Sequence, residues 1–289
     1  GISMKNLGSV IREVRQSKAL TLKQVAGSEL SVAFLSKVER GNSDISLNNF
    51  LIVLKALNIS WDEFFYVARG YQVGNGLKFM EKIKKYMLED NVYGLQRLQS
   101  IEATMCNDDS NYHHFNVIII DLIISQIQHT QFKKESVTEL QTYLLNVENW
   151  GIYELTLFNN VMFCFPTPVL SLLLDNAMKK AIAYRHLPQY EELLMIIICN
   201  NLEITLQQKN IVQAEKIVAQ STEIYRNKRI SLSNMKFKFL QGILMMYTGD
   251  VDSGKKLVVG VIEACYVLGD DEQAYSFEKY LNESTNFEI

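Results

Sequence analysis

The chain has 289 residues, of which 48% are hydrophobic and 21% charged, so it holds enough apolar side chain to bury the core of one or two folded domains. Its four cysteines stand singly without C-x-x-C spacing, which argues against a zinc cage and a disulfide framework. No apolar run is long enough to span a bilayer, and no charged-then-apolar leader follows Met4, the start that we expect for the natural protein. We expect a folded cytoplasmic protein without metal or cofactor.

The net charge of −3 is unevenly distributed along the sequence. Residues 1–70 hold nine Lys and Arg against six Asp and Glu, a charge of +3, which leaves −6 for the rest of the chain. Attraction to a polyanion such as a phosphate backbone therefore belongs to the N-terminal part. The acidic remainder should stay away from such a partner.

Residues 4–69 contain five short helical patterns separated by polar turns, which predict a compact five-helix domain. The second pattern opens with Thr21, and Gln24 three residues later completes a capping box. After a polar turn, Ser31 is the expected N-cap of the third helix and Gly41 its left-handed end. Two amphipathic helices joined by a compact turn are the pattern of a helix-turn-helix.

The third helix would turn small and basic side chains to solvent, because Phe34, Leu35 and Val38 form its inward face at helical spacing. Small residues with Lys and Arg suit a helix in the DNA major groove, since acids would be repelled by phosphate. An ordinary helical hairpin with a solvated basic face is the alternative. The candidate DNA-contacting residues are Arg12, Arg15, Lys23, Gln24, Ser31, Val32, Ala33, Ser36, Lys37 and Arg40.

The string S-x-x-x-L-S-K-V-E-R-G, from Ser31 to Gly41, resembles the recognition helix of the XRE family of bacterial and phage repressors. The match extends upstream over the first helix and downstream over residues 45–65, where that family has its fourth and fifth helices. One feature departs from the pattern, because Leu30 stands where such repressors usually carry Gly and the turn is one residue longer. The resemblance implies a lambda-repressor-like DNA-binding domain whose docking angle is open.

Residues 70–76 contain three glycines and are predicted to be a linker, ahead of a second part over 77–289 that shows no strand alternation. This second part is expected to be all helix. The predicted helices span residues 77–89, 92–105, 112–129, 133–146, 150–163, 167–185, 189–208, 211–227, 231–247, 251–268 and 271–282.

An internal repeat indicates how these helices are arranged. The segment KNIVQAEKIV from Lys209 aligns with GDVDSGKKLV from Gly249 at a shift of forty residues, and Ala214 matches Gly254. A polar turn followed by a small residue near the helix start is typical of tetratricopeptide repeats, because the small side chain lets paired helices pack closely. We predict an all-α, right-handed, tetratricopeptide-like solenoid, with a simple helical bundle as the alternative.

The concave face of such a solenoid suits an extended peptide, whose backbone needs amide partners and whose apolar side chains need an apolar floor. Asparagines recur on the predicted first helices of the pairs, among Ile, Phe and Met. A single asparagine of this kind is more often a cap or a surface residue, so only the recurrence of asparagines favours a peptide site. The candidate peptide-binding residues are Trp150, Tyr153, Asn159, Asn160, Ile197, Asn200, Asn201, Asn234, Lys238 and Met245.

The whole arrangement resembles the Rgg/GadR/MutR family of transcriptional regulators of low-GC Gram-positive bacteria, through residues 30–71 and through a single XRE-like head on a repeat-bearing helical body. The resemblance implies a homodimer that binds promoter DNA and whose repeat domain binds a short hydrophobic peptide pheromone in quorum sensing. We expect the body to carry most of the dimer interface through aromatic residues of its last helices, which are Tyr266, Tyr275, Phe277 and Tyr280.

Two other classes of protein fit parts of the sequence. Asp108-Asp109 and His113-His114 lie close together and could indicate an enzyme, but adjacent residues point different ways on a helix and lack metal-ligand spacing. No phosphate-binding glycine loop, H-E-x-x-H motif or nucleophile elbow accompanies them, so no enzyme is predicted. An XRE-type repressor or antitoxin-like scaffold whose helical domain binds a folded protein stays open as an alternative.

Overall fold

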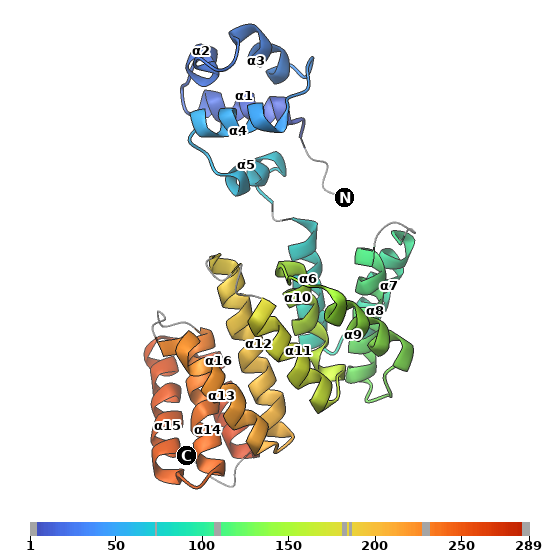
Figure 1. Ribbon diagram of the computed structural model, residues 1–289, viewed down its shortest axis with the longest axis vertical. Helices are drawn as coiled ribbons and strands as arrows, with labels where there is room; N and C mark the ends of the chain where they lie inside the picture. The colour runs from blue at the N-terminus through green and yellow to red at the C-terminus, as the bar shows by residue number, and fades with distance from the viewer. Residues whose placement is uncertain are drawn as a thin grey trace. The chain divides into compact units, whose positions relative to one another are not determined.

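The computed structural model describes residues 5–72, 74–106, 111–180, 184, 187–226 and 232–284. Over these residues the secondary structure is helical and contains no strand, which confirms the all-α prediction (Figure 1). In the same residues no helix has both the length and the apolarity to cross a bilayer. The helices are α1 Leu7–Ser17, α2 Leu22–Ala26, α3 Val32–Glu39, α4 Leu47–Ala56, α5 Trp61–Ala68, α6 Asn75–Leu88, α7 Val92–Thr104, α8 Asn111–Ile127, α9 Lys134–Asn146, α10 Ile152–Val161, the 3₁₀ helix η1 Met162–Cys164, α11 Thr167–Lys180, α12 Pro188–Gln207, α13 Ile211–Arg226, α14 Leu232–Tyr247, α15 Val251–Val267 and α16 Asp271–Ser284.

The chain divides into two compact units, residues 1–95 and 96–289. This division falls inside α7, whereas the sequence suggested a boundary at the glycine-rich residues 70–76. The N-terminal unit thus includes α6 and the first turn of α7 beside the five head helices. The domain limits expected from the sequence stay predictions.

Helices α1 to α5 enclose one apolar core in the N-terminal unit. Thr21 and Gln24 form the predicted capping box, in which the Gln24 N–H donates to Thr21 Oγ1 at 3.2 Å and the Thr21 N–H donates to Gln24 Oε1 at 2.8 Å. Every head helix begins in a comparable way, at a side chain that accepts from a backbone N–H of the first turn. These caps are Asn6, Thr21, Ser31, Ser46 and Ser60.

The turn between α2 and α3 is set by Gly27, which has φ +58° and ψ −140°. Residues with a Cβ atom rarely adopt this conformation, so the turn does contain a glycine, at an earlier position than in the family pattern. Leu30, which stands at that family position, is partly buried against the head core. The longer turn therefore still anchors α3, whose Leu35 and Val38 are buried as predicted.

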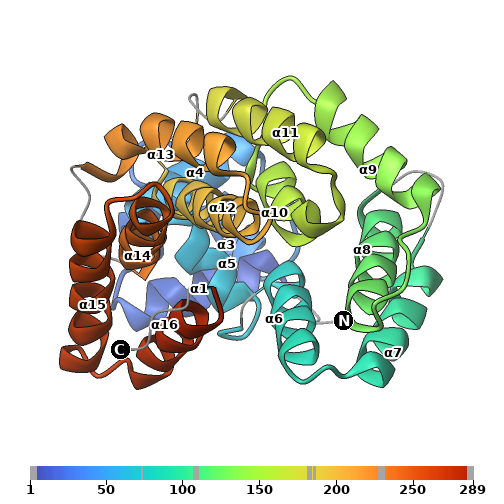
Figure 2. The ribbon, with the colours of Figure 1, turned by 90° about the horizontal axis from the view of Figure 1, so that it is seen from below.

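The helices of the second unit lie in two layers. Helices α10, α12 and α14 pack side by side, while α11 and α13 pack against α12, and α13 and α15 against α14. Figure 2 shows α11, α13 and α15 along the outside of an arc and α10, α12 and α14 along its inside. Helix pairs that stack in this way form the predicted solenoid.

The predicted helices of the second part match the observed ones, with ends that differ by two residues or fewer in all but one case. The predicted helix 150–163 is α10 followed by η1, because the chain ahead of Pro166 leaves the α conformation. The predicted end at Arg185 lies outside the described residues.

The repeated turn is present at both predicted places and occurs a third time. In each turn a residue with positive φ precedes an Asn or Asp whose side-chain oxygen accepts from the backbone N–H three residues on, at 3.2 to 3.4 Å. A small buried residue stands four positions after this cap. In the order positive φ, cap and small residue, the turns are Lys209, Asn210, Ala214; Gly249, Asp250, Gly254; and Gly269, Asp270, Ala274.

Candidate functional site

The outward face of α3 is the first candidate surface. The Ser31 hydroxyl accepts from the Phe34 N–H at 3.1 Å and fixes the start of the helix. Val32, at 44% exposure, and Lys37 are open to solvent. Of the other predicted contacts, Ser36 is half-buried and the exposed ones are Arg12, Lys23, Gln24, Ser31, Ala33 and Arg40. The head therefore presents the small and basic surface that the sequence indicated.

Arg15 does not belong to that surface. Its guanidinium donates to both carboxylate oxygens of Glu39, at 2.7 and 2.9 Å, and to the Leu20 carbonyl at 2.8 Å. The Arg15 and Glu39 side chains are only 12% and 4% exposed. Hydrogen bonding to Glu39 raises the pKa of Arg15 further above its usual range, so the guanidinium stays protonated. Arg15 thus ties α1 to α3 and positions α3, a role that the sequence did not indicate, while its DNA contact stays a prediction.

Sequence reasoning gave Glu39 no role. The sequence feature that could have indicated a role for Glu39 is an acid on the inward side of α3, one residue after the buried Val38. A carboxylate at such a place requires a cation nearby, because burying an unpaired charge is costly.

A row of polar side chains crosses α10, α12 and α14 in the second unit. Asn200 Nδ2 donates to Asn159 Oδ1 at 3.0 Å, and Lys236 Nζ donates to Asn200 Oδ1 at 3.0 Å. Lys236 also pairs with Glu203 Oε2 at 2.6 Å. The sequence predicted Asn159 and Asn200 and missed Lys236 and Glu203. We call Asn159, Asn200, Glu203 and Lys236 the polar row.

Tyr153, another predicted peptide contact, has a buried hydroxyl that makes no hydrogen bond in the described structure. Burial raises the pKa of this hydroxyl to about 12. The ring centroid lies 5.9 Å from that of Tyr112 and 6.3 Å from that of Tyr143. A buried O–H without an acceptor can donate to a ligand, so Tyr153 remains a candidate contact.

Family models match both parts of the chain. The model for the C-terminal domain of the HTH-type transcriptional regulator Rgg matches residues 98–279, and a helix-turn-helix model matches residues 11–64. The first of these spans more than half of the sequence. The chain belongs to the Rgg family of HTH-type transcriptional regulators.

Solved structures share the fold of this Rgg family chain. A candidate transcriptional regulator from Listeria monocytogenes EGD-e is 21% identical with a TM-score of 0.87, and the match covers 98% of each chain. The Streptococcus dysgalactiae SHP pheromone receptor Rgg2 is 24% identical with a TM-score of 0.80, over 96% of this chain and all of that one. PrgX in complex with cCF10 is 18% identical with a TM-score of 0.77, over 99% and 94%.

Three predicted peptide contacts of this Rgg family chain are buried side chains in the packing between helices. Trp150 is fully buried, and its indole N–H donates to the Leu144 carbonyl at 3.0 Å. Ile197 is also fully buried, and Asn201 is 1% exposed with the Thr205 hydroxyl near it. In the described residues these three side chains lie in the packing between helices, and Asn201 Nδ2 makes no hydrogen bond there, so their role as peptide contacts stays a prediction.

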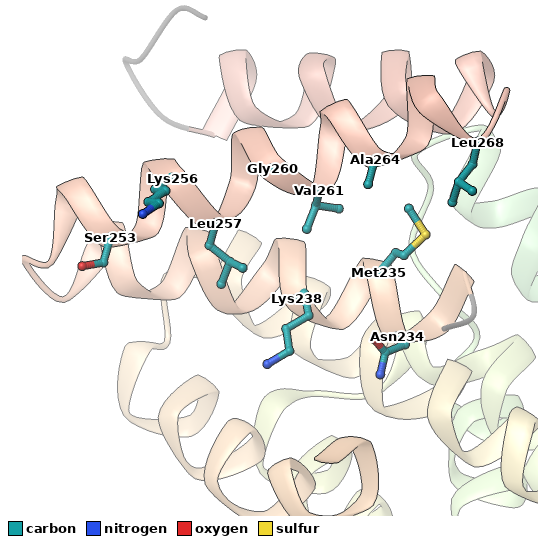
Figure 3. A pocket seen from close by; sticks show the side chains of 10 residues that line it. All are labelled: Asn234, Met235, Lys238, Ser253, Lys256, Leu257, Gly260, Val261, Ala264 and Leu268. Carbon is teal, nitrogen blue, oxygen red and sulfur yellow. The ribbon is translucent and has the colours of Figure 1, made fainter. Parts of the chain in front are cut away.

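Asn234 and Lys238 lie on another face of α14 than Lys236, since residues two apart on a helix point in nearly opposite directions. They line a pocket between α14 and α15 rather than extending the polar row (Figure 3). Asn160 and Met245 are each half-buried, and neither is part of the polar row. The structure thus separates the predicted contacts on α14 from the pair formed by Asn159 and Asn200.

The aromatic residues expected at a dimer interface are only partly exposed. Tyr266 and Tyr275 are 45% and 67% exposed. Phe277 is 4% exposed and stacks on Phe239 at a centroid distance of 4.3 Å, and the Tyr280 ring lies edge-on to the same phenylalanine. The expectation of an exposed ring is therefore wrong for Phe277, while Tyr280 is half-buried. Both rings pack α16 onto α14.

The histidine pair forms two separate contacts. His113 Nδ1 lies 2.7 Å from Glu102, and His114 Nε2 lies 2.8 Å from Glu139 on another helix. Within the described ranges, no group of three His, Cys, Asp or Glu side chains could hold a metal ion. Asp108 and Asp109 lie outside the described residues.

Proposed function

We propose that this Rgg family regulator binds promoter DNA as a homodimer through the exposed face of α3, and that a short hydrophobic peptide binds over the polar row of its helical body. It would act in the cytoplasm as a peptide-responsive switch in quorum sensing and not as an enzyme. The polar row is the observation that carries the ligand part of this proposal.

The DNA part is supported by the shape and charge of α3. Its exposed side chains are small or basic, so the helix can approach base edges without repelling phosphate. A single recognition helix covers few base pairs, and proteins of this kind double it on a palindromic site, which favours a homodimer.

The peptide part is supported by the chemistry of the polar row. Asn159 and Asn200 bring neutral amide groups together across neighbouring helices, and an amide can both donate to and accept from a peptide backbone. Helices α10 and α12, which carry the two asparagines, also carry large buried apolar side chains. Two solved structures of this fold are described as a pheromone receptor and as a complex with cCF10, which agrees with a peptide ligand.

Lys37→Ala should weaken binding of the full chain to a duplex selected from random DNA. Lys37 is exposed on α3, so its ammonium group can reach a base edge or the adjoining phosphate. Loss of one base contact costs about 1 to 3 kcal/mol, whereas loss of one phosphate contact reduces the salt slope by about one. Fluorescence anisotropy at several salt concentrations measures both. Lys55→Ala on α4 is the matched control, and equal binding by both variants would exclude α3 from the groove.

Asn200→Leu should abolish the rise in melting temperature that short apolar peptides encoded beside the gene give to the parent protein. Asn200 is the residue that joins Asn159 to Lys236, so its loss removes the centre of the row. Gln220→Leu, which replaces an exposed amide on α13, is the matched control and should leave the shift intact. If no peptide stabilises the parent while a folded partner protein does, the scaffold alternative would replace this proposal.

A further inference from the structure

A pocket of about 560 Å³ lies between α14 and α15, and it does not include the residues of the polar row. Its size falls in the range of about 300 to 1,000 Å³ that is usual for small-molecule sites. Figure 3 shows Met235, Ala264 and Leu268 toward one end and Ser253 and Lys256 toward the other. Asn234 lies beside Met235, so the first end is mainly apolar with one amide, and the other end is cationic.

The charges that line this pocket all have the same sign. No Asp or Glu is among its lining residues, which include Lys238 and Lys256. Lys238 Nζ donates to the neutral Gln241 Oε1 at 3.1 Å. Lys256 makes no hydrogen bond or ion pair with the described part of the chain. Two ammonium groups without a counter-charge beside an apolar surface favour an anion.

Gly260 keeps one wall of the pocket open. A Cβ atom added to it would meet nothing within 4 Å, whereas one at Gly254 would lie 2.6 Å from the Gly242 carbonyl oxygen. Close packing therefore explains Gly254 and does not explain Gly260. Glycine inside a helix costs roughly 0.5 to 1 kcal/mol relative to alanine. The presence of glycine at position 260 is explained if a larger side chain there would occupy space that a ligand needs.

We propose that the pocket between α14 and α15 binds a straight-chain aliphatic carboxylate. The carboxylate would lie between Lys238 and Lys256, and the chain would lie along Met235, Val261 and Leu268. A single negative charge suits two solvent-exposed ammonium groups, and an unbranched chain suits a lining without aromatic rings. This inference does not depend on the proposed peptide, since Lys236 joins the polar row from another face of α14.

Decanoate, kept below its micelle concentration, is the probe for calorimetric titration of the full chain. Lys256→Gln should weaken binding about three- to fivefold, as expected for a partly exposed ion pair. Gly260→Leu should reduce binding at least tenfold, because the new side chain would fill the pocket. Lys255→Gln, which alters the neighbouring lysine, is the matched control and should bind like the parent.

Decanol and decanamide test the role of the charge, and both should bind more weakly than decanoate. Equal binding of decanol, undiminished binding by Gly260→Leu, or no binding to the parent would each overturn the proposal. Sedimentation of Gly260→Leu without decanoate gives a further test. A shift from dimer to monomer would mean that a second copy of the chain covers this pocket, which would also overturn it.

Discussion

Glu39→Ala should unfold the head under conditions in which the body remains folded. The substitution leaves the Arg15 guanidinium, whose side chain is 12% exposed, without its carboxylate partner. Removing one partner of a buried ion pair costs about 3 to 5 kcal/mol. Amide hydrogen exchange of the full chain, followed by mass spectrometry, should therefore speed up in α1 to α5 by about a hundredfold or more, wherever exchange requires opening of the head.

Two variants separate this effect from an ordinary loss of charge. Glu13→Ala removes the Lys5–Glu13 pair, whose side chains are 43% and 39% exposed, and should change exchange little because such pairs contribute about 0 to 1 kcal/mol. The double variant Arg15→Met with Glu39→Leu should be more stable than Glu39→Ala alone, since it leaves no unpaired charge. Unchanged exchange in Glu39→Ala would contradict a structural role for the pair.

The same pair changes how an Arg15 variant is interpreted. Arg15→Ala would weaken DNA binding even if Arg15 never touches phosphate, because α3 would lose its tie to α1 through Glu39. The Leu20 carbonyl would also lose the donor that holds it. A lower affinity with an unchanged salt slope and faster exchange in the head would be the signature of this indirect effect.

Local rules made the helices predictable from the sequence. The Thr21 and Ser31 caps and the inward Leu35 and Val38 depend only on residues within a few positions of one another, and the structure has them as predicted. The repeat at Lys209 and Gly249 was found for the same reason, since each turn is encoded within a short segment.

Contacts between distant segments could not be predicted in the same way. Glu39 and Lys236 are surface-type residues in the sequence, and only the packing of α1 on α3 and of α12 on α14 gives them partners. Trp150 shows the opposite difference, since it was predicted to contact a ligand and the structure has it fully buried. A large amphipathic ring suits a ligand site or a core equally well. Burial depends on the neighbouring helices, which helical periodicity does not identify.

The third copy of the turn, Gly269 to Ala274, contained a local signal that was missed. A glycine, an aspartate and an alanine four residues later repeat the pattern of Gly249, Asp250 and Gly254 without further sequence similarity. A search for the cap and the small residue alone, rather than for an aligned segment, would have found it.

Gly254→Ala should destabilise the body, although the equivalent positions of the other two turns already carry alanine. A Cβ at residue 254 would lie 2.6 Å from the Gly242 carbonyl oxygen and 2.6 Å from Met246 Cγ, so α14 and α15 would have to separate. Overpacking of this kind costs about 1 to 3 kcal/mol. Ala214 and Ala274 are fully buried at the equivalent positions, so the turn itself accommodates a Cβ atom. At residue 254 the atoms that leave no room for a Cβ belong to the facing helix α14.

Gly260→Ala is the matched control for Gly254→Ala on the same helix. Its Cβ would meet nothing within 4 Å, so the variant should gain about 0.5 to 1 kcal/mol from the higher helix propensity of alanine. Urea unfolding of the full chain is followed by tryptophan fluorescence in a Trp61→Phe background, which leaves the buried Trp150 as the reporter of the body. The two variants should shift the unfolding midpoint in opposite directions from that of the parent. Equal midpoints for the two variants would mean that α14 and α15 are not held in contact at Gly242 and Gly254.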